Sequence, residues 1–189
     1  MIVAISTSSA WASVALLGAQ SGVLASASRE APRQSGGACL EMLQVLMVEA
    51  GVELGDASLF VADVGPGSFT GVKVGVTLAK VLAFANGVPV AGVSSFDLID
   101  PGRVVALPSK RGETWVRVPG SVATVLAGPA PDGAVGFGPG ISSEVWPDAA
   151  LADSLRSHWE PCAAEVFVPE YGREPSISVP KVPYGAHGL

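Results

Sequence analysis

Residues 59–93 read LFVADVGPGSFTGVKVGVTLAKVLAFANGVPVAGV, and this stretch decides the fold. Leu59–Val64 is a short apolar run, which is typical of a buried strand. The Gly65-Pro66-Gly67 break ends this strand, and Ser68 can cap a long helix that reaches the next Asn-Gly pair. Val88–Val93 is a second apolar run. Because a helix connects the two predicted strands, they are expected to lie parallel in one sheet.

Three further strands are predicted before this unit. Met1–Ser6 and Ala12–Leu17 are rich in apolar and β-branched residues, and a short polar turn separates them. Val23–Ser28 continues the pattern, so the three segments predict an antiparallel meander. After the meander, apolar residues recur at helical spacing between Leu40 and Ala50, and Gly51 is a natural helix end. The order βββαβαβ indicates an α/β protein with a mixed sheet, not a dinucleotide-binding βαβ unit.

The second half of the chain has weaker patterns. Its predicted strands are Arg103–Leu107, Thr114–Val118, Val122–Leu126 and Ala134–Phe137, and its predicted helix is Ala149–Trp159. From Pro169 onward prolines are frequent and periodicity is low, so an extended or poorly ordered end is expected.

The composition predicts a packed globular protein, because 49% of the 189 residues are apolar and only 15% are charged. A net charge of -6 with 11 Lys plus Arg makes the chain a poor candidate for binding nucleic acid by itself, since contacts with phosphates dominate that affinity. No uninterrupted apolar run reaches the roughly 18 residues of a membrane-spanning helix, and no secretory signal pattern is present. A cytoplasmic protein without membrane contact is expected, with Cys39 and Cys162 as buried, reduced thiols.

Small residues on the second helix have two interpretations. Gly71, Gly75 and Ala79 lie four residues apart and form one smooth stripe. Because Gly in a helix interior costs about 0.5–1 kcal/mol relative to Ala, a close contact is expected to compensate. That contact is either a partner helix or this chain's own sheet, and spacing alone favours neither. Phosphate binding is less favoured, because GPGSFTG matches neither GxxxxGK[ST] nor GxGxxG.

Three stretches carry a resemblance to a known family. Residues 61–99, VADVGPGSFTGVKVGVTLAKVLAFANGVPVAGVSSFDLI, carry it most strongly through their glycine-rich motif. Residues 1–17, MIVAISTSSAWASVALL, match the family's first hairpin, and residues 108–118, PSKRGETWVRV, match a segment of its second lobe. Together they resemble the TsaB family, the bacterial scaffold proteins for threonylcarbamoyladenosine formation in tRNA.

The resemblance implies an α/β, actin-like (ribonuclease H-like) fold with two lobes. It places the first lobe at residues 1–100, a divergent and shortened second lobe at 101–168, and an extended Pro-rich tail at 169–189. It also implies a non-catalytic scaffold subunit, without cofactor or metal, that dimerises with and activates the TsaD-type enzyme. A TsaE-type ATPase is expected in the same assembly, a homodimer is expected when the chain is alone, and tRNA is reached only through the complex.

In this family the subunits meet through the two helices of the first lobe. The resemblance therefore implies these partner-binding residues: Ser68, Gly71, Val72, Gly75, Val76 and Ala79 on the second helix, and Leu43, Leu46 and Met47 on the first. Replacing Gly71 or Gly75 with a bulky residue is accordingly expected to abolish association and to leave the monomer folded.

The chain departs from the family at positions associated with chemistry. Relatives usually carry Asp in the first strand, where this chain has Ser6, and His-Ser before the first helix, where it has Gln34-Ser35. In the second lobe, Pro108 replaces an aspartate. Each change removes a candidate catalytic or nucleotide contact.

Two other functions stay open at this point. An actin-like small-molecule kinase or ATPase needs acidic magnesium ligands near the hairpins, and Ser6 speaks against it. An M22-type metallopeptidase needs several convergent ligands, whereas His158 and His187 lie far apart in the sequence. Ser94-Ser95 is predicted to cap a helix or turn, because no GxSxG elbow surrounds it.

Overall fold

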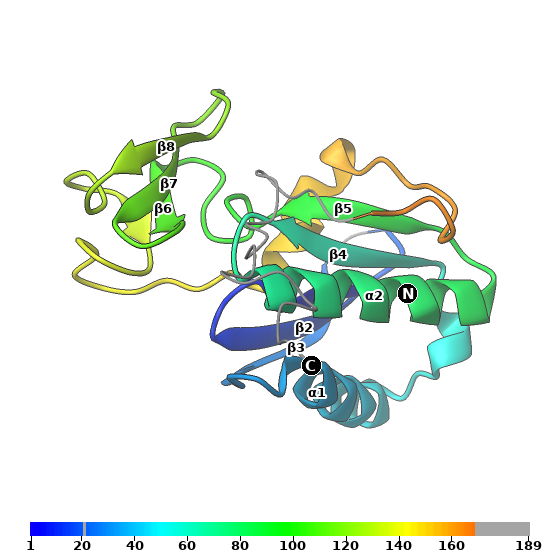
Figure 1. Ribbon diagram of the computed structural model, residues 1–189. Helices are drawn as coiled ribbons and strands as arrows, with labels where there is room; N and C mark the ends of the chain where they lie inside the picture. Colours follow the sequence, from blue (N-terminus) through cyan, green and yellow to red (C-terminus); the bar gives the residue numbers. More distant parts are fainter. Residues whose placement is uncertain (21, 169–189) are drawn as a thin grey trace, which may run out of the picture.

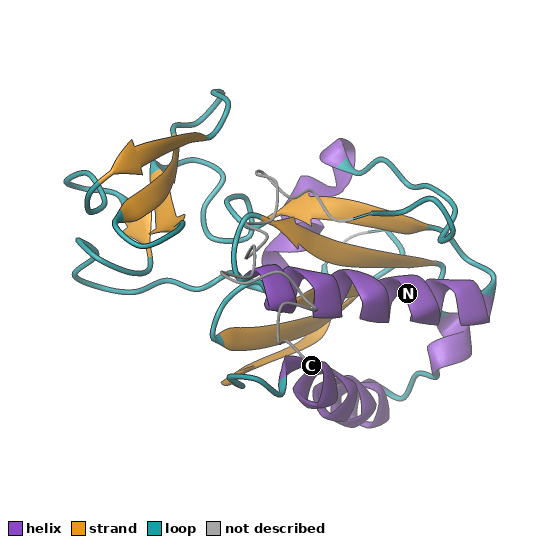
Figure 2. Ribbon diagram, in the orientation of Figure 1, coloured by secondary structure: helices purple, strands orange, loops and turns teal. Residues whose placement is uncertain are grey.

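The computed structural model describes residues 1–20 and 22–168, and the predicted tail at 169–189 lies outside them. The chain forms two sheets of unequal size (Figure 1). A larger α/β body carries both α-helices, and loops join it to the smaller sheet beside it (Figure 2). This arrangement confirms the predicted α/β fold class with a mixed sheet.

The larger sheet has five strands in the order β3-β2-β1-β4-β5. These strands are β1 (Ile2–Ser6), β2 (Trp11–Leu17), β3 (Val23–Glu30), β4 (Leu59–Gly65) and β5 (Val90–Ser94). β1 pairs antiparallel with β2 and parallel with β4, and β4 pairs parallel with β5. The predicted meander and the predicted parallel pair are both confirmed, and β1 is the strand that joins them.

Two helices cover one face of this sheet, α1 (Ser35–Ala50) and α2 (Phe69–Asn86) (Figure 1). Each ends at a left-handed glycine, Gly51 or Gly87, with φ near 65°. Cys39 of α1 belongs to the core beneath the helices, and burial raises the pKa of its thiol to about 12. β1 and β4 are buried at every position, which explains why their sequences are continuous apolar runs rather than alternating ones.

The smaller sheet has four strands in the order β8-β7-β6-β9. They are β6 (Val105–Pro108), β7 (Glu113–Arg117), β8 (Thr124–Ala127) and β9 (Val135–Gly136). Each overlaps a strand predicted from the sequence, with ends shifted by one or two residues. Phe96 and Ile99 lie in the connection after β5 and pack against Val105 and Leu107 of β6. These contacts hold the smaller sheet against the segment that precedes it.

The chain after the smaller sheet returns to the larger one. The helix predicted near residue 149 is a 3₁₀ segment, η2 (Ala149–His158), and it covers the face of the larger sheet opposite α1 and α2. Cys162, which is half-buried, then pairs with Val90 of β5. A short 3₁₀ turn, η1 (Leu54–Asp56), was not predicted. The predicted lobe boundaries stay a prediction. η2 falls within the predicted second lobe, 101–168, and its apolar side chains pack in the core of the larger sheet.

By length and composition alone, α2 is long and apolar enough to cross a membrane, with a mean hydropathy of 1.2 over 18 residues. The sequence was expected to contain no membrane-spanning helix, because no apolar run is long enough without interruption. Lys73 and Lys80 interrupt α2, but its mean hydropathy still reaches 1.2. The core helix of an α/β layer passes the same test, and α2 buries one face against β1 and β4. The hydropathy of α2 is therefore weak evidence for a membrane span.

Candidate functional site

The start of α2 is held by the turn between β1 and β2. The Ser68 hydroxyl oxygen accepts a hydrogen bond from the Gly71 amide at 3.2 Å, which confirms the predicted N-cap. The Ser68 amide donates to the Ser8 carbonyl at 2.7 Å. The Thr7 hydroxyl donates to the Gly71 carbonyl, also at 2.7 Å. The helix and the turn are thus joined by both backbone and side-chain bonds.

The helix glycines make room for this turn. A Cβ on Gly71 would lie 2.0 Å from the Thr7 carbonyl oxygen, and a Cβ on Gly75 would lie 2.4 Å from the Thr7 hydroxyl oxygen. Real Cβ atoms essentially never make such short contacts. Gly71 and Gly75 therefore give no evidence for a partner interface, and their partner-binding role stays a prediction. The compensating contact is the chain's own first turn, which was the alternative that spacing had left open.

Most other predicted partner-binding residues also face inward. Among the nine, Ser68 is exposed and Met47 is half-buried, whereas the rest are buried in the core: Gly71, Val72, Gly75, Val76, Ala79, Leu43 and Leu46. In the stripe of small residues, Gly71 and Gly75 face the first turn and Ala79 packs in the core beneath the helix. The predicted helices are present, and their opposite faces are the ones left uncovered by the described chain.

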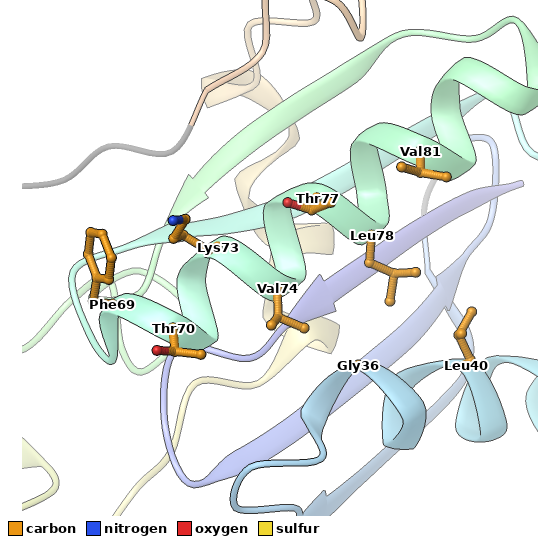
Figure 3. Close-up of a pocket in the computed structure, with 9 residues that line it drawn as sticks. All are labelled: Gly36, Leu40, Phe69, Thr70, Lys73, Val74, Thr77, Leu78 and Val81. Atoms are coloured by element: carbon orange, nitrogen blue, oxygen red, sulfur yellow. The ribbon is translucent and has the colours of Figure 1, made fainter.

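An apolar groove lies on those opposite faces, between α1 and α2 (Figure 3). Its volume is about 530 Å³, and its lining residues are Gly36, Leu40, Phe69, Thr70, Lys73, Val74, Thr77, Leu78 and Val81. Figure 3 shows the side chains of Leu40 and Leu78 pointing into the space between the helices. Leu40 is 48% exposed and Val81 57% exposed, although both are large apolar residues. Surfaces of this kind mark interaction sites more often than plain solvent-facing surface.

The groove residues were missed because a sequence pattern shows a helix face without showing what covers it. A usable signal was present, since α2 carries apolar residues on every side. A helix that is apolar all round usually has both faces buried. In this structure only the face toward β1 and β4 is covered by the described chain.

The buried carboxylate of Asp63 lies beside the first hairpin. Asp63 follows the Ile5–Ala62 pair of the β1–β4 ladder by one position, so it lies beside Ser6. The Ser6 and Ser8 hydroxyls each donate to Asp63 Oδ2 at 2.6 Å. The Ser95 hydroxyl donates to Oδ1 at 2.5 Å, and the Gly65 amide donates to the same oxygen at 2.9 Å. Ser6 stands where relatives carry an aspartate, and β4 places the Asp63 carboxylate beside that position.

Burial governs the chemistry of this carboxylate. Removal from water raises the pKa of Asp63, and the hydrogen bonds from the three serines and from Gly65 oppose that effect. The side chain is fully enclosed, and its oxygens already accept four bonds. This arrangement ties strands and turns together. It also gives Ser95 a structural role, while the Ser94 hydroxyl accepts from the Phe96 amide and so caps the turn as predicted.

An ion pair joins the smaller sheet to the turn after β5. The Arg117 guanidinium contacts the Asp97 carboxylate and donates to the Asp100 carbonyl at 2.9 Å. A cleft of about 480 Å³ lies beside this pair, between Gly65-Pro66 and Trp115. Arg117 lines the cleft, but Asp97 already pairs its charge. The contact positions the smaller sheet rather than presenting an unpaired cation to a ligand phosphate.

Comparison with known proteins places this geometry in context. Residues 22–100 match the TsaD family, tRNA N6-adenosine threonylcarbamoyltransferase. A stretch of 44 residues is 50% identical to the tRNA threonylcarbamoyladenosine biosynthesis protein TsaB of Bacillus subtilis, covering 23% of this chain and 19% of that protein. A stretch of 93 residues is 35% identical to the protein of the same name from Escherichia coli, covering 44% of this chain and 40% of that protein. The chain therefore spans less than half the length of either curated relative.

The similarity of structure is more extensive. YeaZ from Pseudomonas aeruginosa superposes with a TM-score of 0.72 at 25% sequence identity, over 90% of this chain and 98% of that one. Since the superposed part is much longer than residues 22–100, it extends well beyond the stretch matched by sequence.

Proposed function

The chain is a TsaB/YeaZ-like protein, and we propose that it acts in forming threonylcarbamoyladenosine in tRNA as a non-catalytic subunit that dimerises with and activates a TsaD-type enzyme. A TsaE-type ATPase belongs to the same proposed assembly, and the chain forms a homodimer when alone. The proposed complex is cytoplasmic, and tRNA is contacted only through it.

The apolar groove between α1 and α2 carries this proposal. It lies on the part of the chain that matches the TsaD family, so we expect a TsaD-type partner to present a corresponding pair of helices. Val45 and Val48 on α1 and Phe84 on α2 are further exposed apolar residues on the same two helices. Lys73 is the charged residue among those lining the groove, and its ammonium lies 5.0 Å from the centre of the Phe69 ring. A face of this composition gains free energy when another apolar helix covers it.

Two observations favour this role over an actin-like kinase or ATPase. Asp63, the carboxylate near the first hairpin, is enclosed by four hydrogen-bond donors and does not face the cleft between the sheets. Arg117, which lines that cleft, is paired with Asp97. Neither side chain is placed to hold magnesium or a phosphate.

Replacing Val81 with aspartate is expected to weaken binding to the TsaD-type protein of the same organism by at least about a hundredfold. An unpaired charge buried in an interface costs about 3–5 kcal/mol. Because Val81 is 57% exposed in the monomer, the free energy of unfolding should change by no more than about 0.5 kcal/mol. Titration calorimetry of the pair and urea unfolding of the variant measure the two effects.

Val122→Asp is the matched control, since Val122 is 88% exposed but lies in the connection between β7 and β8, away from the groove. It should bind like the unaltered protein. The interface assignment fails if V81D binds normally or if V122D weakens binding equally. An in vitro assay of threonylcarbamoyladenosine formation in tRNA is run with each variant and with no subunit added. It separates loss of pairing from loss of activation.

A further inference from the structure

Asp63 is buried, and none of the described residues supplies a counter-ion. The groups that face it are hydroxyls and one amide: Ser6 from β1, Ser8 from the turn, Gly65 from the end of β4, and Ser95 from beyond β5. The charged side chains on the neighbouring elements are directed elsewhere. Lys73 lies over Phe69, Lys80 donates to the Glu165 and Phe167 carbonyls, and Asp97 pairs with Arg117. Within the described ranges, no charged group balances the Asp63 carboxylate.

The four bonds connect Asp63 to the start of α2. Ser8, which donates to Oδ2, also accepts the Ser68 amide through its carbonyl oxygen. Gly65, which donates to Oδ1, accepts the Ser95 amide through its own carbonyl. One carboxylate therefore determines how the first turn, the loop before α2 and the end of β5 sit against one another.

Adding a proton changes what this carboxyl group can do. An ionised carboxylate only accepts hydrogen bonds, whereas a protonated one must also donate. Ser6 and Ser8 both donate to Oδ2, so a proton on that oxygen forces one hydroxyl to become an acceptor. The Gly65 amide cannot reverse its role, because a backbone N–H is only a donor. The Ser95 hydroxyl on Oδ1 can reverse in the same way, so two of the three reversible partners, Ser6 and Ser8, lie on the oxygen that holds the first turn.

We propose that Asp63 is a proton-operated tether, in which uptake of a proton reverses a serine–carboxylate hydrogen bond and changes how the first turn holds the start of α2. Burial raises the pKa of Asp63, so the change takes place at a less acidic pH than for an exposed aspartate. The tether is a property of the single chain and does not depend on the proposed pairing with a TsaD-type protein.

Nuclear magnetic resonance of the full chain tests this tether. The amide signals of Gly65 and Ser68 are followed from about pH 4 to about pH 8, the range that strongly buried carboxyl groups reach. Both signals are expected to shift with one common midpoint above 3.8, the ordinary Asp value. Asp63→Asn should abolish both shifts. Ser8→Ala should remove most of the shift at Ser68 and keep the shift at Gly65.

The outcomes are decisive in either direction. Different midpoints at Gly65 and Ser68, no shift in the unaltered protein, or persistence of both shifts in D63N would each overturn the tether. If D63N does not fold, the unaltered chain and S8A still decide. A Ser68 shift that is unchanged in S8A shows that Ser8 does not transmit the proton's effect.

Discussion

Replacing Gly71 with alanine is expected to destabilise the monomer by more than about 3 kcal/mol, beyond the usual 1–3 kcal/mol for an overpacked core. The added methyl group would meet the Thr7 carbonyl oxygen closer than 3.0 Å. That oxygen belongs to the backbone of a buried turn, so it cannot rotate away as a flexible side chain does. Urea unfolding followed by circular dichroism measures the loss as a lower midpoint.

Gly37→Ala is the matched control, because it adds the same methyl group to the other helix. A Cβ on Gly37 has nothing within 4 Å, so alanine there should raise stability by about 0.5–1 kcal/mol through helix propensity alone. If G71A is as stable as the unaltered protein but fails to bind a partner, the interface prediction made from the sequence is correct after all. Loss of stability without any separate binding defect supports the internal packing.

Asp63→Ala is expected to be the other most damaging single change, with a loss of about 3 kcal/mol or more. It leaves the hydroxyls of Ser6, Ser8 and Ser95 and the Gly65 amide without their acceptor, and each unsatisfied buried group costs about 1–3 kcal/mol. Asp63→Asn keeps an acceptor oxygen and should lose far less. Equal midpoints of urea unfolding for D63A and the unaltered protein would show that the cluster contributes nothing to stability.

The pH dependence of stability gives a second measurement on the same variants. Because burial raises the folded-state pKa of Asp63, the folded chain holds this proton more tightly than the unfolded chain. The resulting stabilisation is fully present below 3.8 and is lost as pH rises through the raised folded-state value. The unaltered protein should therefore lose stability across that window relative to D63N. An identical pH profile for the two proteins contradicts the raised pKa.

Moving the carboxylate from β4 to β1 tests whether the cluster needs Asp63 itself or only one carboxylate among its serines. Ser6→Asp alone places two carboxylates against each other in a buried site, and Asp63→Ser alone removes the acceptor. The double change S6D/D63S restores one carboxylate among serines and should recover most of the stability that either single change removes. A double-mutant cycle with no coupling energy would show that the two positions act independently.

Local sequence determined the order and type of the elements in the first hundred residues. The Ser68 cap, the end glycines Gly51 and Gly87, and the continuous apolar strands are effects of neighbouring residues, and each is present where predicted. The resemblance to TsaB also depends on this stretch. In the second half the strands were located, and the helix predicted at Ala149–Trp159 is present as the 3₁₀ segment η2, which packs on the larger sheet.

Only the tertiary structure decided which helix faces are covered and which distant side chains meet. Both faces of α2 are apolar, so periodicity could not tell the stripe of Gly71 and Gly75 from the open groove beside Val81. Asp63 meets Ser6 across 57 positions of the chain because β4 lies next to β1 in the sheet. Pairing order is settled by the free energy of the whole packed sheet, and no local pattern of residues contains it.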